Sequence, residues 1–237
     1  EGKFRSTIAN FSAFIIPHAS EGDLEVDEYG TLISYSGSDL GITVPNKVNG
    51  IEIKKIGDNA FANSEIVEVV CPRSVTEIGA SAFENCRNLR TVSAISATKI
   101  GENALYNCIN LRNIYFGKLS DIGEYSFYNA GCNQFTIEER SFSLNLENIV
   151  NIPEGAFMGS SVSSIELKDI DKIEKNAFLG CDNLKVLVGT SVQEEYLNVA
   201  SDWASKVVID SVGNERLLDV VLLKRACLGS SEYVEIN

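Results

Sequence analysis

Large apolar residues recur along the middle of the chain at a nearly fixed spacing, with small or polar residues between them. Each unit opens with an isoleucine and has Phe or Leu five residues later. The opening residues are Ile56, Ile78, Ile100, Ile122, Ile152 and Ile173. The first three steps are 22 residues each, and the next two are 30 and 21. A period in the twenties predicts a stacked array of one supersecondary unit, in which neighbours cover each other's apolar side chains.

Turn-forming residues follow the aromatic position of every unit. Two residues after the Phe or Leu the chain holds only Asn or Gly, at Asn63, Asn85, Asn107, Asn129, Gly159 and Gly180. Both residue types tolerate a left-handed backbone, so we expect them to end a short helical turn. The next position is always small, at Ser64, Cys86, Cys108, Ala130, Ser160 and Cys181. These positions predict a tight corner in each unit.

A short strand is expected after each corner, for example at 89–93 and 111–116. Strands of successive units would lie about 4.8 Å apart in a parallel sheet. The pairs predicted to face the core are Leu89 and Val92, Leu111 and Ile114, and Leu184 and Leu187. Alternation then predicts that the residues on either side of the inward positions are exposed, namely Val69, Cys71, Thr91, Ser93, Asn113, Tyr115, Thr136, Glu138, Ser164, Glu166, Val186 and Val188.

The stretch from Val75 to Val92 resembles the repeat of BspA-like leucine-rich repeat proteins, V-x-x-I-G-x-x-A-F-x-x-C-x-x-L-x-x-I. The resemblance covers about residues 23–205. It implies an α/β repeat solenoid with a parallel β-sheet on one face, short helical turns, an N-terminal β cap and a C-terminal helical cap. It also implies an extracellular or cell-surface bacterial protein that binds a protein or a glycan, in particular host matrix. Pro153 and Glu174 replace the glycine that follows the opening isoleucine in the other units, and Leu105 replaces the phenylalanine.

The flanks of the array are expected to cap it, because an open solenoid end exposes core and strand edge. The predicted division is an N-terminal segment, a β cap, the repeats, a capping helix and an apolar helical tail, at 1–22, 23–55, 56–190, 191–209 and 210–237. The first segment is either a signal remnant or a packing segment. The capping helix starts at a capping box, Ser191 to Glu194, and holds Trp203, which we expect in the core rather than stacked on a sugar.

Two segments leave alternatives open. The tail is either a plain packing helix or a degenerate dockerin-like helix, because 219–225 is similar to a dockerin helix. Val208 and Val212 stand where that family's calcium loop has acidic ligands, so we expect no working calcium site. The insertion at 131–150 could carry binding, but its apolar residues are expected to pack it against the solenoid.

The net charge limits the classes of binding partner, and the positions of the cysteines indicate their chemical state. The net charge of −13 argues against nucleic acid and anionic membrane surfaces. No apolar run reaches the 18 or so residues that span a membrane. Three of the six cysteines, Cys86, Cys108 and Cys181, share a column with Ser and Ala, which predicts buried free thiols, although Cys86 and Cys108 would lie within disulfide reach.

No motif for catalysis is present in the sequence. His18 is the single histidine, and the chain has no phosphate-binding glycine loop and no C-x-x-C. We therefore expect a monomeric, non-catalytic protein without cofactor or metal. The candidate ligand-binding residues are Asn113, Tyr115, Thr136, Glu138 and Glu166. Tyr115 is the expected anchor, because exposed aromatics tend to dominate interfaces, and the alternative is an ordinary exposed strand residue. Alternative functions are a structural spacer of a larger surface protein or a dockerin-like scaffold-associated module.

Overall fold

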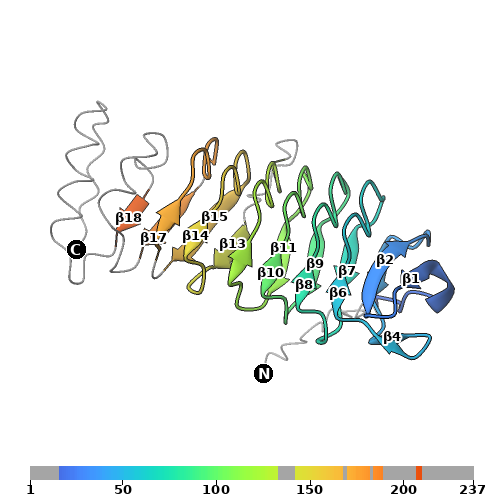
Figure 1. Cartoon of the computed structure of the whole chain (residues 1–237). Helices are drawn as coiled ribbons and strands as arrows, with labels where there is room; N and C mark the ends of the chain where they lie inside the picture. The colour runs from blue at the N-terminus through green and yellow to red at the C-terminus, as the bar shows by residue number, and fades with distance from the viewer. Residues whose placement is uncertain (1–15, 133–141, 168–169, 182–183, 189–206, 210–237) are drawn as a thin grey trace, which may run out of the picture.

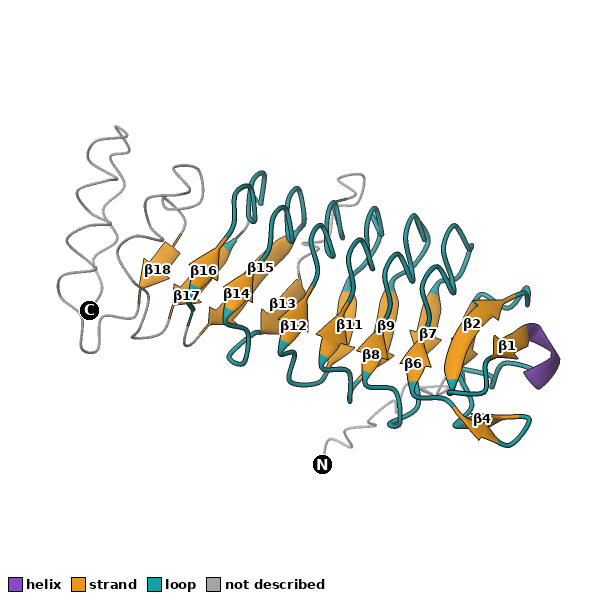
Figure 2. Cartoon of the chain, in the orientation of Figure 1, coloured by secondary structure: helices purple, strands orange, loops and turns teal. Residues whose placement is uncertain are grey.

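The computed structural model describes residues 16–132, 142–167, 170–181, 184–188 and 207–209, and these form a solenoid of stacked rungs (Figure 1). Each regular rung has a longer strand, a short return, a two-residue strand and a corner of consecutive turns. The corners line up along one side of the solenoid, and the strands stack into ladders beneath them (Figure 2). The predicted parallel repeat solenoid is therefore confirmed.

Two parallel ladders organise the first half. One ladder joins β1 (Leu24–Val26), β2 (Thr31–Tyr35), β6 (Lys55–Ile56), β8 (Glu77–Ile78), β10 (Lys99–Ile100) and β12 (Asp121–Ile122). The other joins β3 (Gly41–Thr43), β7 (Glu68–Val70), β9 (Thr91–Ala94) and β11 (Asn113–Phe116). Only the β1–β2 pair is antiparallel in these ladders, and β1 lies at the N-terminal edge as the expected β cap predicts.

The second half has its own ladders. One contains β13 (Phe142–Asn145), β15 (Val162–Leu167), β17 (Lys185–Val188) and β18 (Val207–Ile209). The other contains β14 (Asn151–Ile152) and β16 (Lys172–Ile173). A hairpin of β4 (Lys47–Val48) and β5 (Ile51–Glu52) extends from the cap, which also has one short 3-10 helix, Glu21–Asp23.

The repeated apolar columns form a continuous core. All six opening isoleucines are at most 4% exposed, and so are the residues of the aromatic column. The rings of Phe127, Phe157 and Phe178 stack in sequence, with centroids 5.1 and 5.4 Å apart. Phe61 and Phe83 stack in the same way at 5.1 Å, and Leu105 separates the two groups. Each stacked pair adds about 0.5–1.5 kcal/mol beyond the burial of its area.

The corners are left-handed at the predicted column, but they are turns and not helices. Backbone φ lies between 53° and 73° at all six predicted Asn and Gly positions. A second left-handed column, four residues earlier, was not predicted and holds Asn59, Ser81, Asn103, Tyr125, Gly155 and Asn176. Two left-handed residues per corner turn the N–H groups toward the next rung, as where Phe61 N donates to Ala82 O (2.8 Å). These bonds replace the i to i−4 bonds of a helix.

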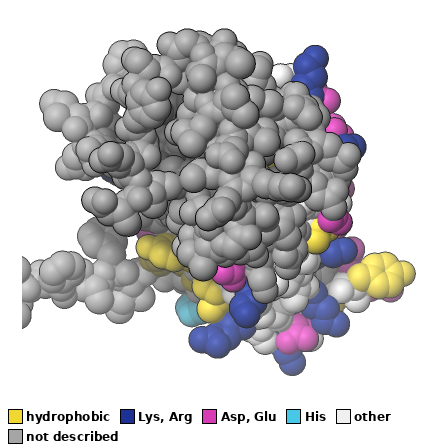
Figure 3. Space-filling model, turned by 90° about the vertical axis from the view of Figure 1, so that its left-hand side faces the viewer, with side chains coloured by type: hydrophobic (Ala, Val, Ile, Leu, Met, Phe, Trp, Pro, Cys, Tyr) yellow, Lys and Arg dark blue, Asp and Glu magenta, His cyan; other side chains and the backbone are white. Residues whose placement is uncertain are grey.

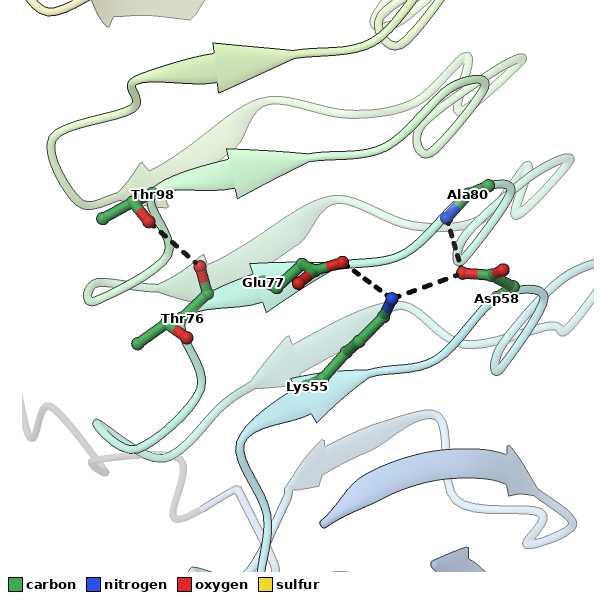
Figure 4. A network of polar contacts seen from close by, with 6 residues as sticks. All are labelled: Lys55, Asp58, Thr76, Glu77, Ala80 and Thr98. Carbon is green, nitrogen blue, oxygen red and sulfur yellow. Dashed lines mark hydrogen bonds and ion pairs between the residues drawn. The ribbon is translucent and has the colours of Figure 1, made fainter. Parts of the chain in front are cut away.

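The glycine that follows the opening isoleucine in the regular rungs lets the backbone of one rung lie directly against the backbone of the rung before it. Gly101 N donates to Ile78 O (2.8 Å), and a Cβ on Gly101 would lie 2.6 Å from Ala80 N. Polar side chains bridge the same rungs at the surface, where Lys55 Nζ lies 2.7 Å from Glu77 Oε1 (Figure 4). Exposed pairs of this kind contribute about 0–1 kcal/mol each, so the ladders and the core hold the rungs together.

Three of the buried cysteines donate a hydrogen bond to the neighbouring rung. Cys86 Sγ donates to Phe61 O (2.9 Å), Cys108 Sγ to Phe83 O (3.1 Å) and Cys181 Sγ to Phe157 O. Burial raises the pKa of Cys86 and Cys108, so these groups remain protonated donors at neutral pH. The prediction of free thiols is confirmed for the five cysteines that the structure describes.

Both ladders of the first half stop at the same level, one after β11 and the other after β12. In the regular rungs the residue after the isoleucine donates to the isoleucine carbonyl of the preceding rung, as Gly123 N does to Ile100 O (2.8 Å). Pro153 has no N–H and cannot donate to Ile122 O. No backbone bond joins β11 to β13 or β12 to β14 among the described residues. The corners remain joined, because Phe127 N donates to Ala156 O (2.8 Å).

The structure corrects two further predictions about individual residues. Val69 and Cys71 are buried and not exposed, and Glu68 and Val70 flank the buried Val69 instead. The register of β17 pairs Val186 with Ile165 and Leu187 with Glu166, one residue out of step with the predicted alternation.

The predicted capping helix at 191–209 cannot reach residue 209, because Val207–Ile209 forms β18. A β-branched run favours a strand over a helix. Its remaining residues, Trp203 among them, lie outside the described part of the chain, as do the first segment up to residue 15 and the tail at 210–237.

Candidate binding surface

The longer strands of the first half present two in-register rows of side chains away from the core. One row contains Glu68, Thr91 and Asn113, and the other contains Val70, Ser93 and Tyr115. Alternation places these rows on the face opposite the buried Val69 and Val92. Asn113 and Tyr115 are exposed and the other four residues of these rows are half-buried, and Ser143 and Asn145 of β13 are exposed next along the solenoid. We call these eight residues the exposed strip.

Tyr115 is the large aromatic of the exposed strip, and 54% of it is accessible to solvent. Its strand neighbour in the row is the small Ser93, so little side chain stands beside the ring on that side. Asn113 is fixed more firmly, because its Nδ2 donates to Thr91 Oγ1 (3.3 Å). The strip therefore pairs an ordered amide with an exposed aromatic ring on a backbone held by ladder bonds.

A cleft of about 290 Å³ opens beside Tyr115, at the break between β11 and β13. Its lining combines apolar side chains with neutral polar groups, and includes Ile95, Ile114, Phe116, Leu119, Ser143 and Leu144. None of the lining residues that the structure describes is charged. Among these residues, Ile95 is 46% exposed.

The cleft follows from the interrupted ladder. Val69 and Val92 are fully buried in their rungs, whereas Ile114 in the same column is only partly buried. The next strand, β13, comes within 8 Å of β11 between Cα atoms but forms no described backbone bond with it. After β11 the chain turns closely under the preceding rung at Gly117, where a Cβ would lie 2.8 Å from Ile95 O. The core edge of β11 is left partly open to solvent.

The structure brings together some of the predicted site residues. Asn113 and Tyr115 lie on the exposed strip, whereas Glu166 lies in the separate ladder of the second half, as the backbone partner of Asn145. Thr136 and Glu138 lie outside the described residues. The strand of their rung is β13, so the insertion precedes the strand, and Ser143 and Asn145 stand where Thr136 and Glu138 were expected.

Both signs of charge occur among the described side chains that are visible when the solenoid is viewed end-on. In that view the described Lys and Arg side chains alternate with Asp and Glu along the rim (Figure 3). Within the described ranges, no three His, Cys, Asp or Glu side chains gather in a way that could hold a metal ion. None of the described helices has the length and apolar character to cross a membrane.

Sequence reasoning missed the cleft and the contribution of Ile95, Ser143 and Asn145. Two signals were present, since Pro153 removes a ladder donor and the long step from 122 to 152 falls in the same rung. Neither signal says on which side of the strand the additional residues lie, and that position decides where the cleft opens.

Comparisons with known proteins agree with this architecture. A family model described as BspA type leucine rich repeat region (6 copies) matches residues 42–145 and 139–196. A search of curated proteins finds no match.

The chain is similar to several solved structures, among them the following two. A leucine rich cell surface protein from Faecalibacterium prausnitzii A2-165 is 25% identical, with a TM-score of 0.53 over 73% of this chain. The chain spans 54% of that protein, about half of its length. The leucine rich repeat protein of T. pallidum is 18% identical, with a TM-score of 0.53 over 92% of this chain and 100% of that one, and shows the same fold.

Proposed function

This chain belongs to the family of BspA-type leucine-rich repeat regions, and from that premise we propose that it is an extracellular or cell-surface protein that binds a protein ligand on its exposed strip. The specific role proposed is adhesion to host extracellular matrix. The similar protein from Faecalibacterium prausnitzii, which is described as a cell surface protein, supports the location. We propose no catalytic activity for the domain.

The observation that carries the proposal is the exposed Tyr115 beside an uncharged cleft, both on a laddered backbone. Exposed aromatic residues next to pockets supply much of the affinity of protein interfaces. The rows of the strip are already ordered by strand pairing, so binding orders few additional groups. Apolar side chains in the lining, such as Ile95 and Leu119, support a protein ligand.

The experiment compares two tyrosine variants of the full chain. Binding to immobilised collagen, laminin and fibronectin is measured by surface plasmon resonance for the wild type, Tyr115→Ala and Tyr29→Ala. Tyr29 is 76% exposed but lies in the β1–β2 turn of the cap, away from the strip. Tyr115→Ala should weaken binding by about 2 kcal/mol, roughly 30-fold, and Tyr29→Ala should leave it unchanged.

Two results would count against the proposal. Equal binding of the wild type and Tyr115→Ala, with unchanged circular dichroism, would remove Tyr115 as the anchor. If the wild type binds none of these proteins and no glycan in an array, the spacer role of the solenoid becomes the better account.

A further inference from the structure

We propose that the cleft between β11 and β13 is a specificity pocket that accepts one large, uncharged apolar side chain of the protein bound on the exposed strip. The inference rests on the proposed function, because the strip supplies the surrounding interface. It adds the chemical class of residue that the ligand must present at this position.

The first support is the incomplete core at the break. The column residue at β11, Ile114, is partly exposed, whereas Val92 in the preceding rung and Ile165 two strands on are fully buried. Phe116 at the end of β11 is also only partly buried, and its ring meets Phe127 edge-on with centroids 6.4 Å apart. An apolar side chain that enters here would cover surface that the regular rungs cover with the next strand.

The second support is the electrostatic character of the lining. The chain has a net charge of −13, yet no charged residue is found among the described residues that line the cleft. A Lys, Arg, Asp or Glu side chain would lose its hydration there without gaining an ion pair, so an uncharged ligand group is favoured. The volume of about 290 Å³ lies at the lower end of the range for ligand pockets, which suits one side chain rather than a folded cofactor.

The third support is continuity with the exposed strip. Tyr115 and Ile95 line the cleft and are 54% and 46% exposed. Ser143, on the β13 side, is exposed and also lines it. A ligand segment that lies across the strip therefore passes over the opening, and covering Ile95 and Tyr115 together removes two exposed apolar groups from water.

The test uses capped amino acids as probes and methyl-labelled protein. N-acetyl-phenylalanine amide and N-acetyl-leucine amide are titrated into the full chain, and the Ile and Leu methyl signals are followed by NMR. N-acetyl-lysine amide and N-acetyl-aspartate amide serve as charged controls. Saturable shifts are expected at Ile95, Ile114 and Leu119 with the apolar probes, and binding of the charged probes should be at least tenfold weaker.

A pair of Ser→Trp variants locates the site. Ser143→Trp places a large ring in the opening and should weaken probe binding at least tenfold, whereas Ser38→Trp, at an exposed position in the cap, should not. The inference is overturned if the apolar probes give no saturable shifts at the cleft methyls, if charged probes bind equally, or if Ser143→Trp has no effect.

The outcomes separate the pocket from the proposed function. Probe binding in the cleft, with no matrix protein bound by the wild type, would support the pocket and count against the proposed ligand class. Matrix-protein binding that depends on Tyr115, with no probe binding and no effect of Ser143→Trp, would support the strip and overturn the pocket.

Discussion

Replacing Ser126 by alanine should stabilise the protein, because its hydroxyl is buried without a hydrogen-bond partner. Ser126 is 0% exposed, and its Oγ has no partner within the described structure. It occupies the column that holds alanine in the other rungs, at Ala60, Ala82, Ala104, Ala156 and Ala177. An alanine therefore fits this site with the same backbone.

The size of the effect follows from the desolvation of the hydroxyl. A buried polar group without a partner costs about 1–3 kcal/mol, and the substitution removes that cost with little loss of packing. We expect Ser126→Ala to raise the free energy of unfolding by about 1 kcal/mol, which corresponds to roughly 2–4 °C in Tm for a chain of this size. Urea unfolding followed by circular dichroism measures the change.

A matched variant tests the reasoning. Ser160 is buried too, but its Oγ lies 3.7 Å from Cys181 Sγ and 3.5 Å from Val162 N. Ser160→Ala should therefore be neutral or destabilise the protein by up to about 1 kcal/mol. A loss of stability in Ser126→Ala, or the same gain in both variants, would refute the assignment of an unpartnered hydroxyl.

Three further substitutions test the rungs. Gly101→Ala should destabilise the protein by about 2 kcal/mol or more in urea unfolding, because its Cβ would lie 2.6 Å from Ala80 N, while Gly22→Ala, with 3.9 Å to the nearest atom, should be neutral. Phe157→Ala should cost about 3–5 kcal/mol in the same assay, and a cost below 1 would contradict its stacked, buried position. Burial raises the pKa of Cys71 to about 12 from 9.0, so its neutral thiol stabilises the fold fully below pH 9 and less as pH rises toward 12. The urea midpoint should fall over that range, and Cys71→Ala should reduce the fall.

The sequence predicts the corners well because backbone energetics restrict them. Only residues that adopt positive φ at low cost fill the column from Asn63 to Gly180, so the column is visible as composition. The second left-handed column was missed because it includes Ser81 and Tyr125, whose types do not indicate that conformation. Neighbouring rungs hold these residues there through backbone bonds, as where Tyr125 N donates to Glu154 O (3.1 Å).

Which residues of a short strand face the core is harder to predict than the presence of the strand. Val69 and Val70 are both apolar, so alternation alone does not say which one faces the core, and the prediction placed Val69 on the wrong face. The register of β17 differs from the prediction by one residue, again in a strand of consecutive apolar residues. Where polar residues alternate cleanly, as at Asn113 and Tyr115, the predicted exposure is confirmed.

The candidate site depends on contacts between rungs that no single repeat specifies. Tyr115 can be recognised from one strand, but the cleft beside it requires the ladder to end at β11 and the insertion to precede β13. Ser143 and Asn145 reach the site only through that geometry.

The most direct test of the central claim, that the exposed strip is the ligand-binding surface, is site-specific photo-crosslinking. A benzophenone amino acid replaces Tyr115 in one variant and Tyr29 in another, and each is irradiated with the matrix proteins that the wild type binds. We predict a covalent adduct from position 115 and none from position 29. Adducts from position 29 with none from position 115 would contradict the account.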